Sequence, residues 1–145
     1  MIKIGFDLDG TLDKPALAVL ARVLMQNPAV EVHIITGIFA EAGEWQSVAA
    51  KLRKLERLGI SVKRPLGDSS LGFVTEVHGN APYAILHALT AVDPEMGLDY
   101  RLRDLGLRKA ALTEELGISV FLDDSKTYCD IMPAMNGGLT ILQVR

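Results

Sequence analysis

The feature that most constrains the fold is a set of short apolar segments that do not alternate with polar residues. They are rich in β-branched and other apolar side chains and cover residues 2–6, 30–35, 118–122 and 140–144. Such segments are typical of strands buried on both faces, as in a parallel sheet covered by helices. Helical patterns separate them, so we expect a three-layer, doubly wound (Rossmann-like) α/β fold.

The segments between these strands carry the spacing and the end signals of helices. Residues 15–25 are apolar nearly throughout and begin with a proline, which suits the first turn of a helix. Two further helices are expected over residues 109–116 and 126–135. Between residues 42 and 57 apolar side chains recur at three and four residue steps, and Gly59 suits the end of that helix. The charged side chains expected on its solvent face are Lys51, Arg53, Lys54, Glu56 and Arg57.

Residues 61–106 fit this alternation least well. We expect a hairpin between residues 61–64 and 72–77, followed by a helix over residues 81–92. A chain of this length normally forms one hydrophobic core. We therefore expect a single domain over residues 1–145, with a small elaboration at about 61–106.

Composition and charge narrow the function classes. Fifteen Lys and Arg against eighteen Asp and Glu give a net charge of −3 without a basic stripe, so no nucleic-acid patch is evident. No apolar run approaches the ~20 residues of a membrane helix, and the N-terminus lacks a signal-peptide pattern, so we expect a cytoplasmic protein without a membrane partner. Ordinary structural roles are expected for Cys129, His33, His78 and His87.

Acidic residues follow the ends of two expected strands. Asp7 and Asp9 follow the first strand, and Asp123 and Asp124 end the strand that covers residues 118–122. Ligands of open α/β sheets bind at these strand ends, so the carboxylates should meet in one crevice. They would repel one another without a cation, and all-oxygen ligation favours Mg²⁺. Magnesium in turn favours phosphate chemistry, in which a carboxylate attacks phosphorus.

The sequence Asp-Leu-Asp-Gly-Thr at residues 7–11 resembles the first motif of the haloacid dehalogenase-like (HAD) superfamily of phosphohydrolases. Residues 34–37 (Ile-Ile-Thr-Gly), Lys109 and residues 121–125 (Phe-Leu-Asp-Asp-Ser) resemble its other three motifs, in the family's order. The resemblance implies a HAD-like fold, here without a large cap domain. It also implies a Mg²⁺-dependent phosphoric monoester hydrolase that acts on a phosphorylated small molecule or a phosphorylated macromolecular end.

The resemblance further implies roles for individual residues. Asp7 would attack phosphorus to form an aspartyl-phosphate, and Asp9 would act as general acid and then as general base. Thr36 would donate a hydrogen bond to the transferring phosphoryl group, whose charge Lys109 would offset. The implied site comprises the catalytic residues Asp7, Asp9, Thr36 and Lys109, the substrate-binding residues Gly10, Thr11 and Gly37, and the metal ligands Asp7, Asp9 (through its backbone carbonyl), Asp123 and Asp124.

Several alternatives stay open on the sequence. A regulatory or binding protein could keep the magnesium site without turnover, although a pure Mg²⁺ binder does not need the Asp9 side chain. A receiver-like signalling domain also phosphorylates an aspartate, but its acidic pair follows the first strand rather than a late one. Arg108 and Lys126 compete with Lys109 for the third motif. With so little chain to cover the site, a homo-oligomer is one way to complete it.

Overall fold

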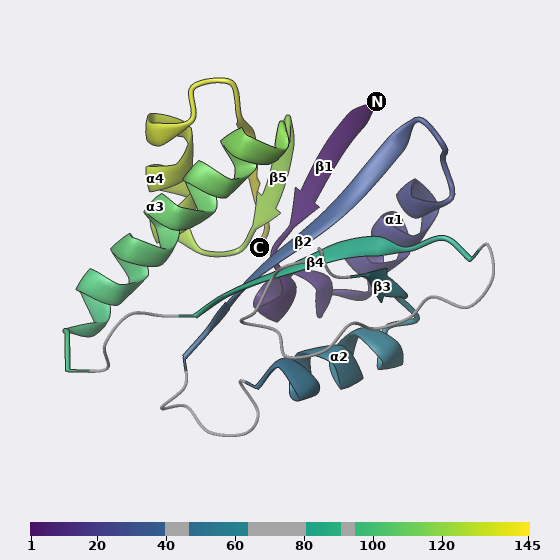
Figure 1. The fold of residues 1–145 in the computed structure, drawn as a ribbon, viewed down its shortest axis with the longest axis horizontal. Helices are drawn as coiled ribbons and strands as arrows, with labels where there is room; N and C mark the ends of the chain where they lie inside the picture. Colours follow the sequence, from purple (N-terminus) through teal and green to yellow (C-terminus); the bar gives the residue numbers. More distant parts are fainter. Residues whose placement is uncertain (40–46, 64–80, 91–94) are drawn as a thin grey trace.

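The structure, a computed structural model, describes residues 1–39, 47–63, 81–90 and 95–145 (Figure 1). Six strands in these residues form one sheet in the order β3-β4-β2-β1-β5-β6. Every neighbouring pair runs parallel. The strands are β1 (Ile2–Phe6), β2 (Val30–Ile38), β3 (Val62–Lys63), β4 (Ala84–Thr90), β5 (Val120–Asp123) and β6 (Thr140–Gln143).

Helices cover both faces of this sheet (Figure 1). Those in the described part of the chain are α1 (Pro15–Met25), α2 (Val48–Arg57), α3 (Leu98–Leu116) and α4 (Lys126–Met135), together with a short helical turn, η1 (Leu8–Leu12). Helices α1 and α2 pack on one face, and α3 and α4 pack on the other. The prediction of an α/β domain with a parallel sheet between helices is therefore confirmed. None of these helices is both long enough and apolar enough to span a membrane.

The two larger hydrophobic cores, one on each face of the sheet, explain why apolar side chains lie on both faces of β2. On β2, Ile34 packs into the core under α1 and α2, whereas its neighbour Ile35 packs into the core under α3 and α4. Both side chains are fully buried. Burying a side chain of this size stabilises the fold by roughly 1.5–3 kcal/mol, so a polar residue on either face would be costly.

The helix expected over residues 81–92 is wrong in its described part, because residues 84–90 form β4. This strand lies between β3 and β2 and pairs with six consecutive residues of β2, from His33 to Ile38. Its residues suit a helix by local propensity, but the packing of a central strand overrides that preference. Of the expected hairpin, β3 pairs in parallel with β4, and residues 72–77 lie outside the described residues.

Helix α3 begins at Leu98, well before the start expected near Lys109. Its first half therefore belongs to the helical layer, although it falls within the segment at 61–106 that was expected to be an elaboration. Gly117, with φ +74°, ends this helix, and Gly59, with φ +72°, follows α2. Both glycines adopt the left-handed conformation that commonly ends a helix, as predicted for Gly59.

The order of the strands reverses at β1. The chain first places β2 beside one edge of β1 and later places β5 beside the other edge of β1. A strand order that reverses in this way separates the loops at the carboxyl ends of the two strands, and ligands of open α/β sheets bind there. Asp7 follows β1 at this point, and Asp123 is the last residue of β5.

Candidate active site

Three carboxylates gather at the carboxyl ends of β1 and β5. Asp7, Asp123 and Asp124 each offer an oxygen that lies within 4.8 Å of the oxygens of the other two. Asp7 and Asp123 are buried, whereas Asp124 is exposed. The parallel register brings them together, because Phe6 pairs with Leu122 and the Asp7 N–H donates to the Leu122 carbonyl at 2.9 Å.

The ammonium group of Lys109 lies between two of these carboxylates. It donates to Asp7 Oδ1 and to Asp123 Oδ2, both at 3.1 Å. The side chain is 1% exposed, and its Nζ also lies 4.3 Å from the centroid of the Tyr128 ring. Burial lowers the pKa of Lys109, but the Asp7 and Asp123 carboxylates outweigh burial and raise this pKa above its ordinary value. Lys109 is therefore a charged partner of the acidic cluster.

The two basic alternatives to Lys109 make other contacts. Arg108 Nη1 donates to the carbonyl of Thr90 at 2.6 Å. Lys126 pairs with Asp130 at 2.7 Å, and its side chain is 79% exposed. Of the three basic residues considered, Lys109 is the one whose contacts join the carboxylates.

The acidic cluster carries more negative than positive charge. Burial raises the pKa of Asp7 to about 7, an effect that the Lys109 ammonium opposes and the Asp123 carboxylate reinforces. Burial also raises the pKa of Asp123. Lys109 pairs with Asp7 and Asp123, and Asp124 adds a third carboxylate, so acidic groups outnumber ammonium groups among the described residues of the cluster. All-oxygen donors with an excess of negative charge fit a hard divalent cation such as Mg²⁺.

The turn η1 packs against the same carboxylates. Thr11 Oγ1 lies 3.4 Å from Asp7 Oδ2 and 3.4 Å from Asp124 Oδ1. Gly10 has φ +81°, a conformation that favours glycine. A Cβ atom at this position would also meet the Asp124 carboxylate, which would have to move. Gly10 and Thr11 thus line the cluster, and their role toward phosphate stays a prediction.

The Asp9 side chain makes its ion pairs with α2. Lys51 Nζ pairs with Asp9 Oδ2, and Lys54 Nζ lies 2.7 Å from Asp9 Oδ1. Burial raises the pKa of Asp9, but the hydrogen bonds from both lysines outweigh it and lower this pKa below its ordinary value. Asp9 is therefore ionised near neutral pH.

The expectation that Lys51 faces solvent is wrong. The Lys51 side chain is 2% exposed, because it lies on the inner face of α2, where its ammonium group pairs with the Asp9 carboxylate. Lys54, also expected to face solvent, is 23% exposed and paired. Lys51 follows Val48 by three residues and precedes Leu55 by four, which puts it on the apolar stripe of the helix. That spacing was the signal for its burial.

The second motif lies inside β2 rather than after it. Thr36 and Gly37 pair with Ala88 and Leu89 of β4, and the strand continues to Ile38. Thr36 is buried, and among the described residues neither it nor Gly37 has a hydrogen bond to the acidic cluster. Their assignment to phosphate binding stays a prediction.

The residues expected to be structural have ordinary partners where they are described. His33 Nδ1 lies 3.0 Å from His87 Nε2, and its Nε2 lies 2.6 Å from Glu31 Oε1. Burial lowers the pKa of His33 and raises the pKa of the Cys129 thiol to about 11, so this thiol is protonated at neutral pH. His78 lies outside the described residues.

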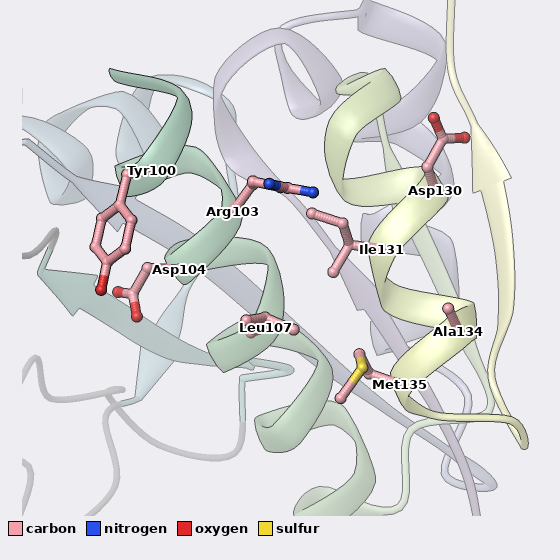
Figure 2. Close-up of a pocket in the computed structure, with 8 residues that line it drawn as sticks. All are labelled: Tyr100, Arg103, Asp104, Leu107, Asp130, Ile131, Ala134 and Met135. Carbon is pink, nitrogen blue, oxygen red and sulfur yellow. The ribbon is translucent and has the colours of Figure 1, made fainter. Parts of the chain in front are cut away.

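A separate groove of about 500 Å³ lies between α3 and α4 (Figure 2). None of the expected site residues lines it. Apolar side chains predominate along it, and Arg103 and Ile131 lie in the gap between the two helices. Its lining residues are Tyr100, Arg103, Asp104, Leu107, Asp130, Ile131, Ala134 and Met135.

Comparison with known proteins gives partial similarity. No known family model matches the chain. A pyridoxine 5′-phosphate synthase from Geotalea daltonii is 31% identical over 85 residues, and one from Geotalea uraniireducens is 32% identical over 85 residues. Each match covers 52% of this chain and 35% of the relative. Matches of this extent do not assign the chain to a family.

Proposed function

We propose that this protein is a Mg²⁺-dependent, HAD-like phosphatase that hydrolyses phosphate monoesters through an aspartyl-phosphate on Asp7. The observation that carries the proposal is the arrangement around Asp7. This carboxylate follows the central strand β1, accepts a hydrogen bond from Lys109, and shares a cluster with Asp123 and Asp124. A nucleophile beside a buried cation and two further metal-ligating groups suits phosphoryl transfer.

Asp7, Asp123 and Asp124 would hold the magnesium ion, together with the backbone carbonyl of Asp9. Their donors are all oxygen atoms, as Mg²⁺ prefers. When bound, the ion supplies positive charge that offsets the charge of the phosphoryl group. Lys109 adds a fixed ammonium group to the same site.

The chain's own residues would carry two displacement steps. Before the first step, the Asp9 carboxylate must leave Lys51 and Lys54 and take up a proton from solvent. In this step a carboxylate oxygen of Asp7 bonds to phosphorus, the ester P–O bond breaks, and the leaving oxygen takes that proton from Asp9. In the second, Asp9 removes a proton from water, whose oxygen bonds to phosphorus and releases Asp7 and inorganic phosphate. The hydroxyl of Thr11 would bind a phosphate oxygen, and the Gly10 N–H, which donates to Asp13 Oδ2 at 2.7 Å, would bind one after releasing that carboxylate.

Phosphate release from a panel of monoesters, with and without Mg²⁺, tests the proposal. We include pyridoxine 5′-phosphate, because the partially similar proteins are named for that compound. We expect Mg²⁺-dependent release that is lost in Asp7→Asn and kept in the control Asp130→Asn, whose carboxylate is exposed on α4. Mass spectrometry of a trapped intermediate should find the phosphoryl group on Asp7. Turnover by Asp7→Asn would refute the mechanism.

One observation favours a second candidate, a binding or regulatory protein that keeps the magnesium site. Both carboxylate oxygens of Asp9 are engaged by lysines, and an ionised carboxylate cannot donate a proton. Under this alternative, calorimetry would detect binding of Mg²⁺ and of phosphate esters, while the same panel would yield no inorganic phosphate.

A further inference from the structure

The first half of α3 extends beyond the carboxyl end of β1. Near the end of this helix, the Leu116 carbonyl accepts a hydrogen bond from Lys3 Nζ at 2.9 Å, close to the start of β1. Seven residues earlier, Lys109 Nζ donates to Asp7 Oδ1, just after the end of β1. The helix therefore runs opposite to β1, and its earlier part, the α3 overhang (residues 98–108), continues past the strand end (Figure 1).

Contacts with β2 follow the same path. A Cβ atom on Gly37, near the end of β2, would lie 3.1 Å from Leu105 Cδ1. One turn closer to the start of α3, the Arg101 guanidinium lies 5.6 Å from the centroid of the Phe39 ring. Phe39 follows the last residue of β2. The α3 overhang thus passes the end of β2 and stands over the edge of the sheet that carries the acidic cluster.

A cleft of about 270 Å³ lies between the α3 overhang and the first turn of α4. Its lining residues are Asp99, Leu102, Arg103 and Thr127. Leu102 precedes Lys109 by seven residues, and two helical turns take about seven residues, so both lie on the same face of α3. Thr127 follows Asp124 by three residues. Both walls of the cleft therefore lead to the acidic cluster, and the leaving group of an ester bound there can extend into the cleft.

Arg103 supplies the positive charge of this cleft. Its guanidinium lies in the gap between α3 and α4 (Figure 2). Asp104, which lines the neighbouring groove, lies 3.5 Å from Arg108. Asp130, on the other side of that groove, lies 2.7 Å from Lys126. Among the described residues Arg103 itself forms no ion pair, and its planar fork of N–H donors matches a carboxylate.

Asp99 and Thr127 determine what else the leaving group should carry. Asp99 is exposed and lies four residues before Arg103, so the two side chains are neighbours on the helix surface. An ionised carboxylate accepts hydrogen bonds, and a threonine hydroxyl donates and accepts them. Hydroxyl groups on the ligand satisfy both. Because Asp99 repels negative charge, the anionic group of the ligand belongs at the Arg103 end of the cleft.

We propose that this cleft binds the leaving group of the substrate, with Arg103 as the residue that selects a terminal carboxylate. This inference rests on the proposed phosphatase activity and narrows its substrates. The preferred class is phosphate monoesters of a hydroxylated chain that ends in a carboxylate. Arg103 and Lys109 are six residues apart, which is about 9 Å along the helix. The phosphate and the carboxylate are therefore separated by several carbon atoms.

Two pairs of matched esters test the cleft. 6-Phosphogluconate and sorbitol 6-phosphate differ in a carboxylate against a hydroxymethyl group on a six-carbon chain, and 3-phosphoglycerate and glycerol 3-phosphate differ in the same way on three carbons. We expect kcat/KM to be about tenfold higher for 6-phosphogluconate than for sorbitol 6-phosphate, the lower end for a hydrogen bond to a charged group because Arg103 is exposed. The three-carbon pair should differ less, because its chain is too short to reach Arg103.

Substitutions of Arg103 separate its charge from other effects. Arg103→Met should bring the ratio of kcat/KM for the six-carbon esters close to one, and Arg103→Lys, which keeps the positive charge, should retain part of the preference. The matched control is Arg57→Met, which removes an exposed arginine from the last turn of α2. This control should leave the ratio unchanged.

Equal kcat/KM for the two six-carbon esters, or an unchanged ratio in Arg103→Met, would overturn the cleft proposal and leave the phosphatase proposal standing. If no ester is hydrolysed, the phosphatase proposal fails for these esters, and calorimetry in the presence of Mg²⁺ tests the cleft separately. Tighter binding of 6-phosphogluconate than of sorbitol 6-phosphate, lost in Arg103→Met, would support the cleft. Equal binding of the two esters, or binding of neither, would refute it.

Discussion

Replacing Lys109 by methionine should strongly destabilise the metal-free protein. The Lys109 ammonium is buried and lies 3.1 Å from an oxygen of both Asp7 and Asp123. Methionine keeps most of the apolar stem, so the variant chiefly removes the charge. Removing one partner of a buried ion pair costs about 3–5 kcal/mol, because the remaining charges stay buried without compensation.

Protonation of Asp7 sets the pH dependence of this loss. Burial already raises the pKa of Asp7 to about 7, and removal of Lys109 takes away the ammonium that opposes this rise. At a pH below the pKa of Asp7, its carboxyl group is neutral and no longer repels the Asp123 carboxylate, so the lost ammonium group of Lys109 matters less. We therefore expect a larger loss of stability at about pH 8 than at about pH 6.

Urea unfolding of the wild type and of Lys109→Met, in EDTA and in excess Mg²⁺, measures the effect. The loss should shrink in Mg²⁺, because the cation supplies positive charge to the same carboxylates. Lys126→Met serves as the control, since both side chains of its ion pair are largely exposed, and should unfold like the wild type. A loss below about 1 kcal/mol in EDTA at about pH 8, the size of a surface ion pair, would refute the reasoning.

Three further predictions concern the turn, the metal and the histidine pair. Gly10→Ala should lower the free energy of unfolding by about 1–2 kcal/mol because of the positive φ, and should weaken Mg²⁺ binding because the new Cβ displaces Asp124. Urea unfolding and calorimetry measure the two effects, with Gly137→Ala as the control. An unchanged Mg²⁺ affinity would contradict the prediction. Protons compete with Mg²⁺ at Asp7, so calorimetric affinity should rise between about pH 6 and pH 8, and a pH-independent affinity would count against a site that includes Asp7. The pKa of His33 lies below its ordinary value, so the unfolded chain binds the proton more readily, and stability should fall as the pH drops below about 6.5. In His33→Gln, the urea midpoint should decline less over this pH range. An equal decline in both proteins would contradict the prediction.

The sequence predicted the elements whose signals are local. The bounds of β1, α1 and α4 coincide with the predicted residues 2–6, 15–25 and 126–135. An apolar run and a proline in a first helical turn act over a few residues. The structure also shows a local signal that the prediction of α4 did not use, because Ser125 caps this helix by accepting the Tyr128 N–H at 3.3 Å.

The strand β4 had no comparable local signal. Its segment Ala-Ile-Leu-His-Ala-Leu-Thr contains residues that suit a helix as well as a strand. Pairing with β2 on one edge and with β3 on the other decides its conformation. These partners lie outside the segment itself, so a local pattern cannot reveal them.

By itself, the sequence determined the parallel α/β class and the acidic residues at the ends of β1 and β5. The apolar composition of the strand segments and the chain positions of Asp7 and Asp123 can be read without knowledge of the packing. Only the tertiary structure decided which cations meet those carboxylates. In the tertiary structure Lys109 pairs with Asp7, which lies 102 residues away in the sequence, and Lys51 pairs with Asp9, which lies 42 residues away. Such contacts depend on how α3 and α2 pack against the sheet, and the burial that this packing imposes sets the charges and the pKa values of the site.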